Sequence, residues 1–257
     1  MRKKIRWFFI KGLTREAEHW NQFIDQFLVA FPEVETQQID LPGSGQLHSQ
    51  RAPLLMKHVV ESIESRIQLE PESYDNYVFA ASMGAMAAYK WIHRNPGAFK
   101  AAILVNTSMS VVCKPYERFN FRMIKFFPKI IGHYKSYAFR ESFIFDATHA
   151  NKEDRQHVLE QWVDIQRRKP ISLWNSISQL ISSALFYHPE TSKIPILLMR
   201  GMGDELVNPS CSEKLKDVWK TELVTHPSGG HNLMHDDPQW VLTHVKQFLA
   251  SHPSRAT

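Results

Sequence analysis

Three residues far apart in the chain, Ser82, Asp204 and His231, have the types and surroundings of a nucleophile, an acid and a base. Ser82 lies in the stretch AASMGA, where an apolar run turns into a helical pattern. A sharp strand-to-helix turn around a serine requires small residues two positions before and after it, here Ala80 and Gly84. Such a turn would raise the hydroxyl above a sheet, although a serine that only caps the helix fits the same pattern.

The partners of the serine are sought among residues that follow predicted strands. A serine hydroxyl needs a base to take its proton before it becomes a good nucleophile. His231 follows two consecutive glycines, and Asp204 lies in a glycine-flanked turn after the run IPILLMR. His226 and His235 are less well placed, and taken singly a turn aspartate and an exposed loop histidine are ordinary features. Together, in the order serine, acid, histidine, the residues predict a triad: Ser82 attacks, His231 takes and returns the proton, and Asp204 orients the imidazole.

Two backbone amides are the predicted oxyanion donors. Met83 follows the serine at the start of the helical pattern, where its amide can point at a developing negative charge. Leu13 follows the first strand, and Gly12 beside it permits close approach of the backbone. An ordinary strand–helix turn would give the same residues around Leu13.

Alternating strand-like and helical patterns predict a mostly parallel sheet with helices on both faces. The alternation breaks over 108–190, which we interpret as a helical cap inserted into a core of 1–107 and 191–257. Thr14 is the expected N-cap of the first helix. The expected strands are 5–10, 34–40, 76–81, 101–107, 194–201 and 221–227, and the expected helices outside the insertion are 15–29, 53–68, 83–94, 209–219 and 237–250.

The composition sets limits on partners and surroundings. A hydrophobic fraction of 43% allows a sizeable core, and a net charge of +5 alone does not indicate nucleic-acid binding. The two cysteines, Cys113 and Cys211, fit a reducing compartment, and no cysteine–histidine cluster has metal-ligand spacing. The run IRWFFI is too short for a signal peptide, and no run approaches the roughly 20 apolar residues of a membrane span. We expect a cytoplasmic protein without metal or organic cofactor.

Five segments, FIKGLT, IDLPGSG, AASMGA, GMGDELVNP and GGHNLMHDDP, resemble the α/β-hydrolase superfamily over essentially the whole chain outside the insertion. Within it, the chain looks like the capped carboxylesterases that include pimeloyl-[acyl-carrier protein] methyl ester esterase. The resemblance implies an α/β-hydrolase fold with about six strands and a helical lid over the site. Lys11 departs from that branch, which usually has histidine before the oxyanion glycine.

The stretch 114–140 combines seven Lys or Arg residues with many aromatics and one acid, Glu117. A solvated lid whose aromatics pack inward explains this composition most simply. Docking of an acidic acyl-carrier protein is the best functional alternative, ahead of an anionic membrane surface or nucleic acid. The residues expected to take part in docking are Lys114, Arg118, Arg122, Lys125 and Lys129.

The sequence therefore favours a serine hydrolase that cleaves a carboxylic ester or thioester through an acyl-enzyme intermediate. The apolar, aromatic insertion predicts a small-molecule substrate whose acyl group has moderate size and low polarity. Hydrolysis of a C–C bond in a dienoic diketone is an alternative with the same triad. A non-catalytic binding protein that kept the fold is a third hypothesis.

Overall fold

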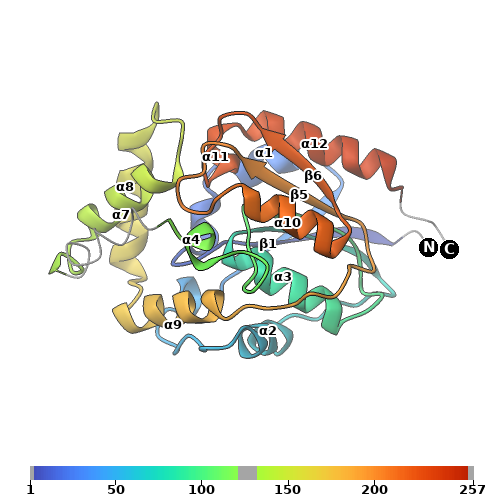
Figure 1. Cartoon of the computed structure of the whole chain (residues 1–257), viewed down its shortest axis with the longest axis horizontal. Helices are drawn as coiled ribbons and strands as arrows, with labels where there is room; N and C mark the ends of the chain where they lie inside the picture. Colours follow the sequence, from blue (N-terminus) through green and yellow to red (C-terminus); the bar gives the residue numbers. More distant parts are fainter. Residues whose placement is uncertain (1–2, 121–131, 254–257) are drawn as a thin grey trace.

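A six-stranded sheet forms the centre of the protein in a computed structural model, which describes residues 3–120 and 132–253 (Figure 1). Neighbouring strands are all parallel, in the order β2–β1–β3–β4–β5–β6. The predicted sheet of about six strands is therefore confirmed. The strands are β1 (Lys4–Ile10), β2 (Val34–Ile39), β3 (Tyr74–Ala81), β4 (Phe99–Val105), β5 (Ile196–Gly201) and β6 (Glu222–His226).

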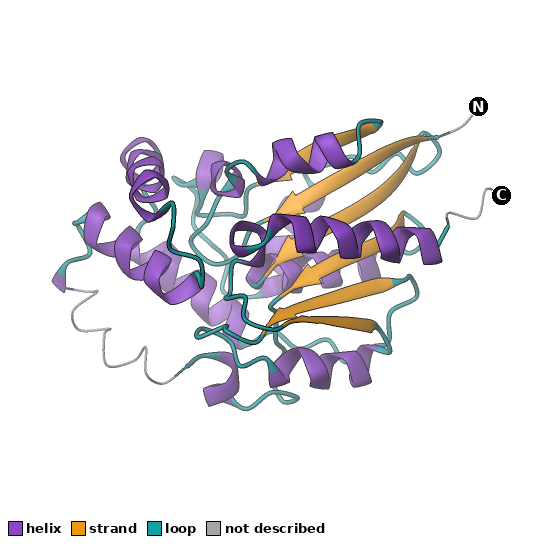
Figure 2. Cartoon of the chain, turned by 90° about the horizontal axis from the view of Figure 1, so that it is seen from above, coloured by secondary structure: helices purple, strands orange, loops and turns teal. Residues whose placement is uncertain are grey.

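Strand β1 shows why both faces of the sheet are covered. Side chains alternate between the two faces of a strand, and in β1 both sets are apolar. Trp7 and Phe9 belong to the core on one face, whereas Phe8 and Ile10 belong to the core on the other. Figure 2 shows a helical layer on each side. The helices are α1 (Phe23–Ala30) and α12 (Pro238–Ser251) on the first face, and α2 (Met56–Glu64), α3 (Met83–Arg94) and α10 (Ser210–Trp219) on the second.

The expected helix over 15–29 is wrong in its first half. A short 3₁₀ turn at Ala17–Trp20 precedes α1, and Asn21 separates the two with a φ of 48° that no α-helix contains. Thr14 is not a helix cap, because its φ is 59° and its amide donates to Gln179 Oε1 at 2.9 Å. The local helical pattern over 15–29 is thus interrupted by the backbone conformation at Asn21.

The segment between β4 and β5 contains α7 (Tyr137–Thr148), α8 (Arg155–Arg168) and α9 (Leu173–Ala184). These helices gather beyond the carboxyl ends of the strands, away from the two chain termini (Figures 1 and 2). Asn175 and Gln179 join α9 to the core: Asn175 Oδ1 accepts from the Ala52 amide at 2.9 Å, and Gln179 Nε2 donates to the Pro42 carbonyl at 3.0 Å. The boundaries of the predicted cap, 108 and 190, stay a prediction.

Both cysteines, Cys113 and Cys211, are buried free thiols. Within 3–120 and 132–253, no helix combines the length and the apolar character needed to cross a membrane.

Candidate active site

Ser82 occupies the turn between β3 and α3, with φ 54° and ψ −122°. This left-handed backbone is strained for a residue with a side chain, and such strain is typical of functional turns. The neighbouring backbone comes so close that a Cβ on Gly84 would lie 2.5 Å from the Lys11 carbonyl oxygen. A Cβ on Gly12 would lie 2.8 Å from Ser82 Cβ. The close approach of the chain at the end of β1 to this turn therefore requires glycine at positions 12 and 84.

Asp204 and His231 are joined by a hydrogen bond of 2.7 Å between Oδ2 and Nδ1. The other carboxylate oxygen accepts the amides of Leu206 and Val207, at 2.8 and 2.9 Å. A neutral imidazole that donates through Nδ1 keeps its lone pair on Nε2. The Asp204 carboxylate, whose side chain is 1% exposed, is thus fixed and fixes the ring in turn.

Asn106 and Thr107 hold the loops of the three predicted residues together, a role that sequence reasoning missed. The Asn106 side-chain amide donates to the carbonyls of Gly230 and His231, at 3.0 and 2.9 Å, and its oxygen accepts the Gly201 amide. Thr107 Oγ1 donates to the Ser82 carbonyl at 3.0 Å. The signal available in the sequence was a pair of uncharged polar residues that closes a buried apolar run.

Ser82 and His231 line one pocket of about 260 Å³, which lies between the strand ends and the inserted helices. That volume lies near the lower limit for small-molecule sites, roughly 300 Å³, and fits a compact ligand. Among the described residues, no hydrogen bond joins Ser82 Oγ to His231. The side of the pocket formed by the segment between β4 and β5 is mainly apolar and includes Phe119, Phe143, Ile144, Ile171, Leu173, Ile177 and Leu180.

The amides of Leu13 and Met83 flank the serine from β1 and from α3. In the part of the chain that the structure describes, no hydrogen-bond acceptor takes up either amide. Leu13 lines the pocket, and Met83 is the first residue of α3, whose N-terminus favours negative charge. Their role as oxyanion donors stays a prediction.

Lys11 begins the loop after β1, which contains Gly12 and Leu13, and has 7% of its surface exposed. Its Nζ donates to Asn232 Oδ1 at 3.2 Å and stands 4.2 Å from the Trp20 ring centre. Burial, with a smaller effect of the Arg15 charge, lowers the pKa of Lys11 to about 7. Lys11 thus links this loop to Asn232, the residue that follows His231. At neutral pH its amine is only partly protonated.

A buried ion pair links the same loop to α7. Arg15 Nη1 and Glu141 Oε2 lie 2.6 Å apart, with 11% and 0% of the side chains exposed. The Arg15 guanidinium lies 4.8 Å from the Trp162 ring centre. Arg15 Nε and Nη2 and Glu141 Oε1 have no hydrogen-bond partner among the residues described. This side of the pocket therefore contains a buried ion pair whose hydrogen-bonding capacity is only partly used.

The sequence comparison decides the family. The profile of a hydrolase family described as serine aminopeptidase, S33, matches residues 4–238, most of the chain. The chain belongs to this family of α/β-hydrolases. The predicted superfamily is confirmed, whereas the capped carboxylesterase branch stays a prediction. Comparison with curated proteins gives no match.

Solved structures share the α/β-hydrolase fold at low sequence identity. A lipase-esterase related protein from Clostridium acetobutylicum has a TM-score of 0.70 and 12% identity, over 96% of this chain and 95% of that one. The RedJ thioesterase of the prodiginine pathway in Streptomyces coelicolor has a TM-score of 0.65 and 15% identity, over 96% and 87%. The 2-hydroxy-6-oxo-6-phenylhexa-2,4-dienoate hydrolase of Rhodococcus sp. strain RHA1 has a TM-score of 0.72 and 13% identity, over 96% and 91%.

The basic residues expected to dock a carrier protein are only partly described. Arg122, Lys125 and Lys129 lie outside the described residues. Lys114 is exposed just before the helical turn α4 (Pro115–Arg118). Arg118 donates through its two terminal nitrogens to the carbonyls of Ser183 and Ala184 at the end of α9. Its guanidinium is therefore engaged in hydrogen bonds within the protein. Docking on this stretch stays a prediction.

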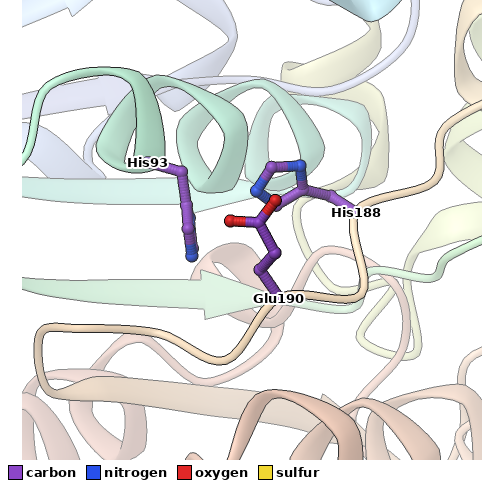
Figure 3. Close-up of side chains that lie close together, drawn as sticks. All are labelled: His93, His188 and Glu190. Carbon is purple, nitrogen blue, oxygen red and sulfur yellow. The ribbon is translucent and has the colours of Figure 1, made fainter.

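One group of side chains in the described part of this α/β-hydrolase has the composition of a metal site. His93, His188 and Glu190 bring ligand atoms within 4.8 Å of one another (Figure 3). His93 is near the C-terminal end of α3, a helix of 12 residues, whereas Ser82 precedes its first residue. At 1.5 Å per residue the helix is about 18 Å long, so this group stands well apart from the pocket.

Proposed function

We propose that the protein is a serine hydrolase that cleaves a carboxylic ester or thioester, with Ser82, His231 and Asp204 as its triad. One observation carries the proposal: Ser82, in a strained turn, lines the same pocket as His231, and the Nδ1 of His231 is hydrogen-bonded to the buried Asp204 carboxylate. Membership of a hydrolase family supports it.

In the proposed mechanism, Ser82 Oγ attacks the carbonyl carbon while His231 Nε2 takes its proton. The amides of Leu13 and Met83 donate to the oxygen that becomes negative. His231 then protonates the leaving alcohol or thiol, and a water molecule hydrolyses the acyl-enzyme by the same steps. Asp204 stays ionised and stabilises the imidazolium. The Ser82–His231 contact has to tighten when substrate binds, as catalytic hydrogen bonds commonly do.

The inserted helices are proposed to act as a lid. Their apolar side chains form the cap side of the pocket, so an acyl chain of low polarity would be buried among them. The hydrogen bonds that Asn175 and Gln179 make between α9 and the core favour a lid that is anchored on this side.

Labelling with a fluorophosphonate probe tests the proposal, because such probes react with activated serines. We expect one label, mapped to the peptide that contains Ser82, and no label in the Ser82→Ala variant. The matched control is Ser228→Ala, which removes an exposed serine from the loop before His231 and should keep the label. A folded protein that stays unlabelled would count against an activated serine and favour a binding protein.

A substrate panel separates ester hydrolysis from C–C hydrolysis. The likeness to the Rhodococcus dienoate hydrolase shows the shared fold and makes the C–C reaction the second candidate. We expect p-nitrophenyl esters to be hydrolysed and dienoic diketones to remain intact. The reverse result would replace the ester proposal by the C–C alternative with the same nucleophile.

A further inference from the structure

A second cluster of side chains lies at the C-terminal end of α3, where the segment after α9 passes on its way to β5. His93 comes from the helix, and His188 and Glu190 come from the segment (Figure 3). The two imidazole centres are 4.5 Å apart with their planes at 72°, and the Glu190 side chain is directed toward both rings. Two imidazoles and one carboxylate are a ligand set that zinc and neighbouring transition metals prefer.

Both ring nitrogens of His93 lie close to backbone carbonyl oxygens. His93 Nδ1 lies 2.9 Å from the Tyr89 carbonyl and Nε2 lies 3.3 Å from the Thr191 carbonyl. A neutral imidazole has only one N–H, so one of these contacts sets a lone pair against an oxygen. The shorter contact assigns the proton to Nδ1. A histidine that donates one nitrogen to a backbone carbonyl and keeps a lone pair on the other is the usual arrangement of a metal ligand, and here that lone pair on Nε2 faces the Thr191 carbonyl, where an ion between them would be favourable.

His188 offers an unused nitrogen on a fixed backbone. Its Nε2 is buried and has no hydrogen-bond partner among the described residues. The His188 carbonyl accepts from Trp219 Nε1 at 2.9 Å, and its amide donates to Met109 Sδ at 3.1 Å. The hydrogen bonds of its amide and carbonyl therefore fix the backbone position from which the His188 ring projects.

Glu190 completes the set from a backbone that is also held. The Tyr89 hydroxyl donates to the Glu190 carbonyl, and the rings of Tyr89 and His93 are 4.4 Å apart. The Glu190 side chain is exposed and free of ion pairs within the described residues, so its carboxylate can move. Tetrahedral ligands around zinc are about 3.3 Å apart, which requires the present atoms to approach by up to about 1.5 Å.

We propose that His93, His188 and Glu190 bind a Zn²⁺ ion or a similar transition-metal ion at the surface of this protein. His93 Nε2, a nitrogen of His188 and a carboxylate oxygen of Glu190 supply three ligands, and water supplies the fourth. The ion would clip the segment that leaves the inserted helices to the end of α3. The role is structural, because the helix separates this position from Ser82.

Metal titration of the full chain tests the proposal after chelator treatment and removal of the chelator. We expect one Zn²⁺ per chain in calorimetry and a Tm that rises by several degrees with Zn²⁺, because a ligand that binds only the folded state stabilises it. Mg²⁺ should give no such shift, since it prefers oxygen ligands. Co²⁺ should give the visible absorption of a tetrahedral site.

Ligand variants decide where the ion binds. His93→Gln and His188→Gln should each abolish the Zn²⁺-dependent Tm shift, and Glu190→Gln should weaken binding by about tenfold or more. His157→Gln, on the exposed side of α8, is the matched control and should keep the shift. Absence of a shift in the wild type, or an unchanged shift in His93→Gln, would overturn the proposal. Because metal binding is read from Tm and heat, its outcome is independent of whether Ser82 is labelled.

Discussion

The two ends of helix α3 present two different kinds of site. At the N-terminal end, Ser82 has a strained backbone and shares a pocket with His231, whose partner Asp204 has a side chain that is 1% exposed and accepts three hydrogen bonds. At the C-terminal end, His93 and His188 are half-buried and Glu190 is exposed. Within the described residues, no hydrogen bond or ion pair joins these three side chains. In the first site, a strained turn and buried hydrogen bonds fix the side chains in place. In the second, the ligand side chains would come together only when an ion binds.

The largest effect is expected from Asp204→Asn, which breaks the N-terminal site without changing its shape. The amide cannot stabilise the imidazolium, and it favours the wrong tautomer of His231. We expect kcat for a p-nitrophenyl ester to fall about a thousandfold or more. Asp217→Asn, an exposed change on α10, should leave kcat within about twofold. A loss of less than about tenfold in Asp204→Asn would argue against the triad.

The buried pair at the same end provides a second test. Arg15→Met leaves the fully buried Glu141 carboxylate without its partner, and we expect the free energy of unfolding to fall by about 3–5 kcal/mol. The double variant Arg15→Met/Glu141→Leu should recover most of the loss, since it removes both charges. Urea denaturation measures both values. Arg155→Met, which breaks the exposed pair with Asp146, should lower stability by less than about 1 kcal/mol.

Lys11 gives a smaller effect with a defined pH dependence. Its pKa is about 7 in the folded protein, lowered from the 10.5 of an unperturbed lysine, so between these values the unfolded chain binds more protons. Stability contributed at this position therefore rises with pH from 7 toward 10. We expect Lys11→Met to be more stable than the wild type at pH 7, by a margin on the order of a few kcal/mol that narrows by pH 9.5. Tm measured across this range checks the trend, and a margin that does not change with pH would contradict it.

A control substitution sharpens the Lys11 experiment. Lys193→Met removes an exposed lysine from the segment before β5. The difference in Tm between this variant and the wild type should be small and independent of pH over the same range. An exposed ammonium has similar surroundings in the folded and unfolded states, so its pKa does not change on folding. The Zn²⁺-dependent Tm shift should survive in Lys11→Met, since Lys11 lies at the opposite end of α3 from the metal ligands.

Local patterns were enough to predict the sheet and the serine turn. The apolar runs of the six strands and the small residues around Ser82 are dictated within a few positions of the chain, so they can be recognised without the fold. Asp204 and His231 could be placed because each follows a strand of a parallel sheet, whose carboxyl ends share one edge. A hydrogen bond joins the two side chains, while their catalytic role stays a prediction.

Features that depend on distant contacts could not be predicted. Residues 15–29 have a helical pattern, yet the left-handed backbone at Asn21 interrupts it, and the Thr14 amide before it is bound by the distant Gln179. The hydrogen bonds of Asn106 with the loop before His231 and the pair of Arg15 with Glu141 join segments 124 and 126 residues apart. His93 and His188 were invisible as a pair for the same reason, since metal-ligand spacing is a sequence signal only when the ligands share one local motif.

The strained backbone of Ser82 also bears on how complexes of this protein can be captured. A φ of 54° is tolerated by glycine much more readily than by serine, so Ser82→Gly relieves strain while it removes the hydroxyl. Serine at this position therefore costs conformational stability that glycine would not cost. Under the proposed function, Ser82→Gly would bind an intact ester without cleaving it, and mass spectrometry of the ligand retained from a metabolite mixture would identify the substrate.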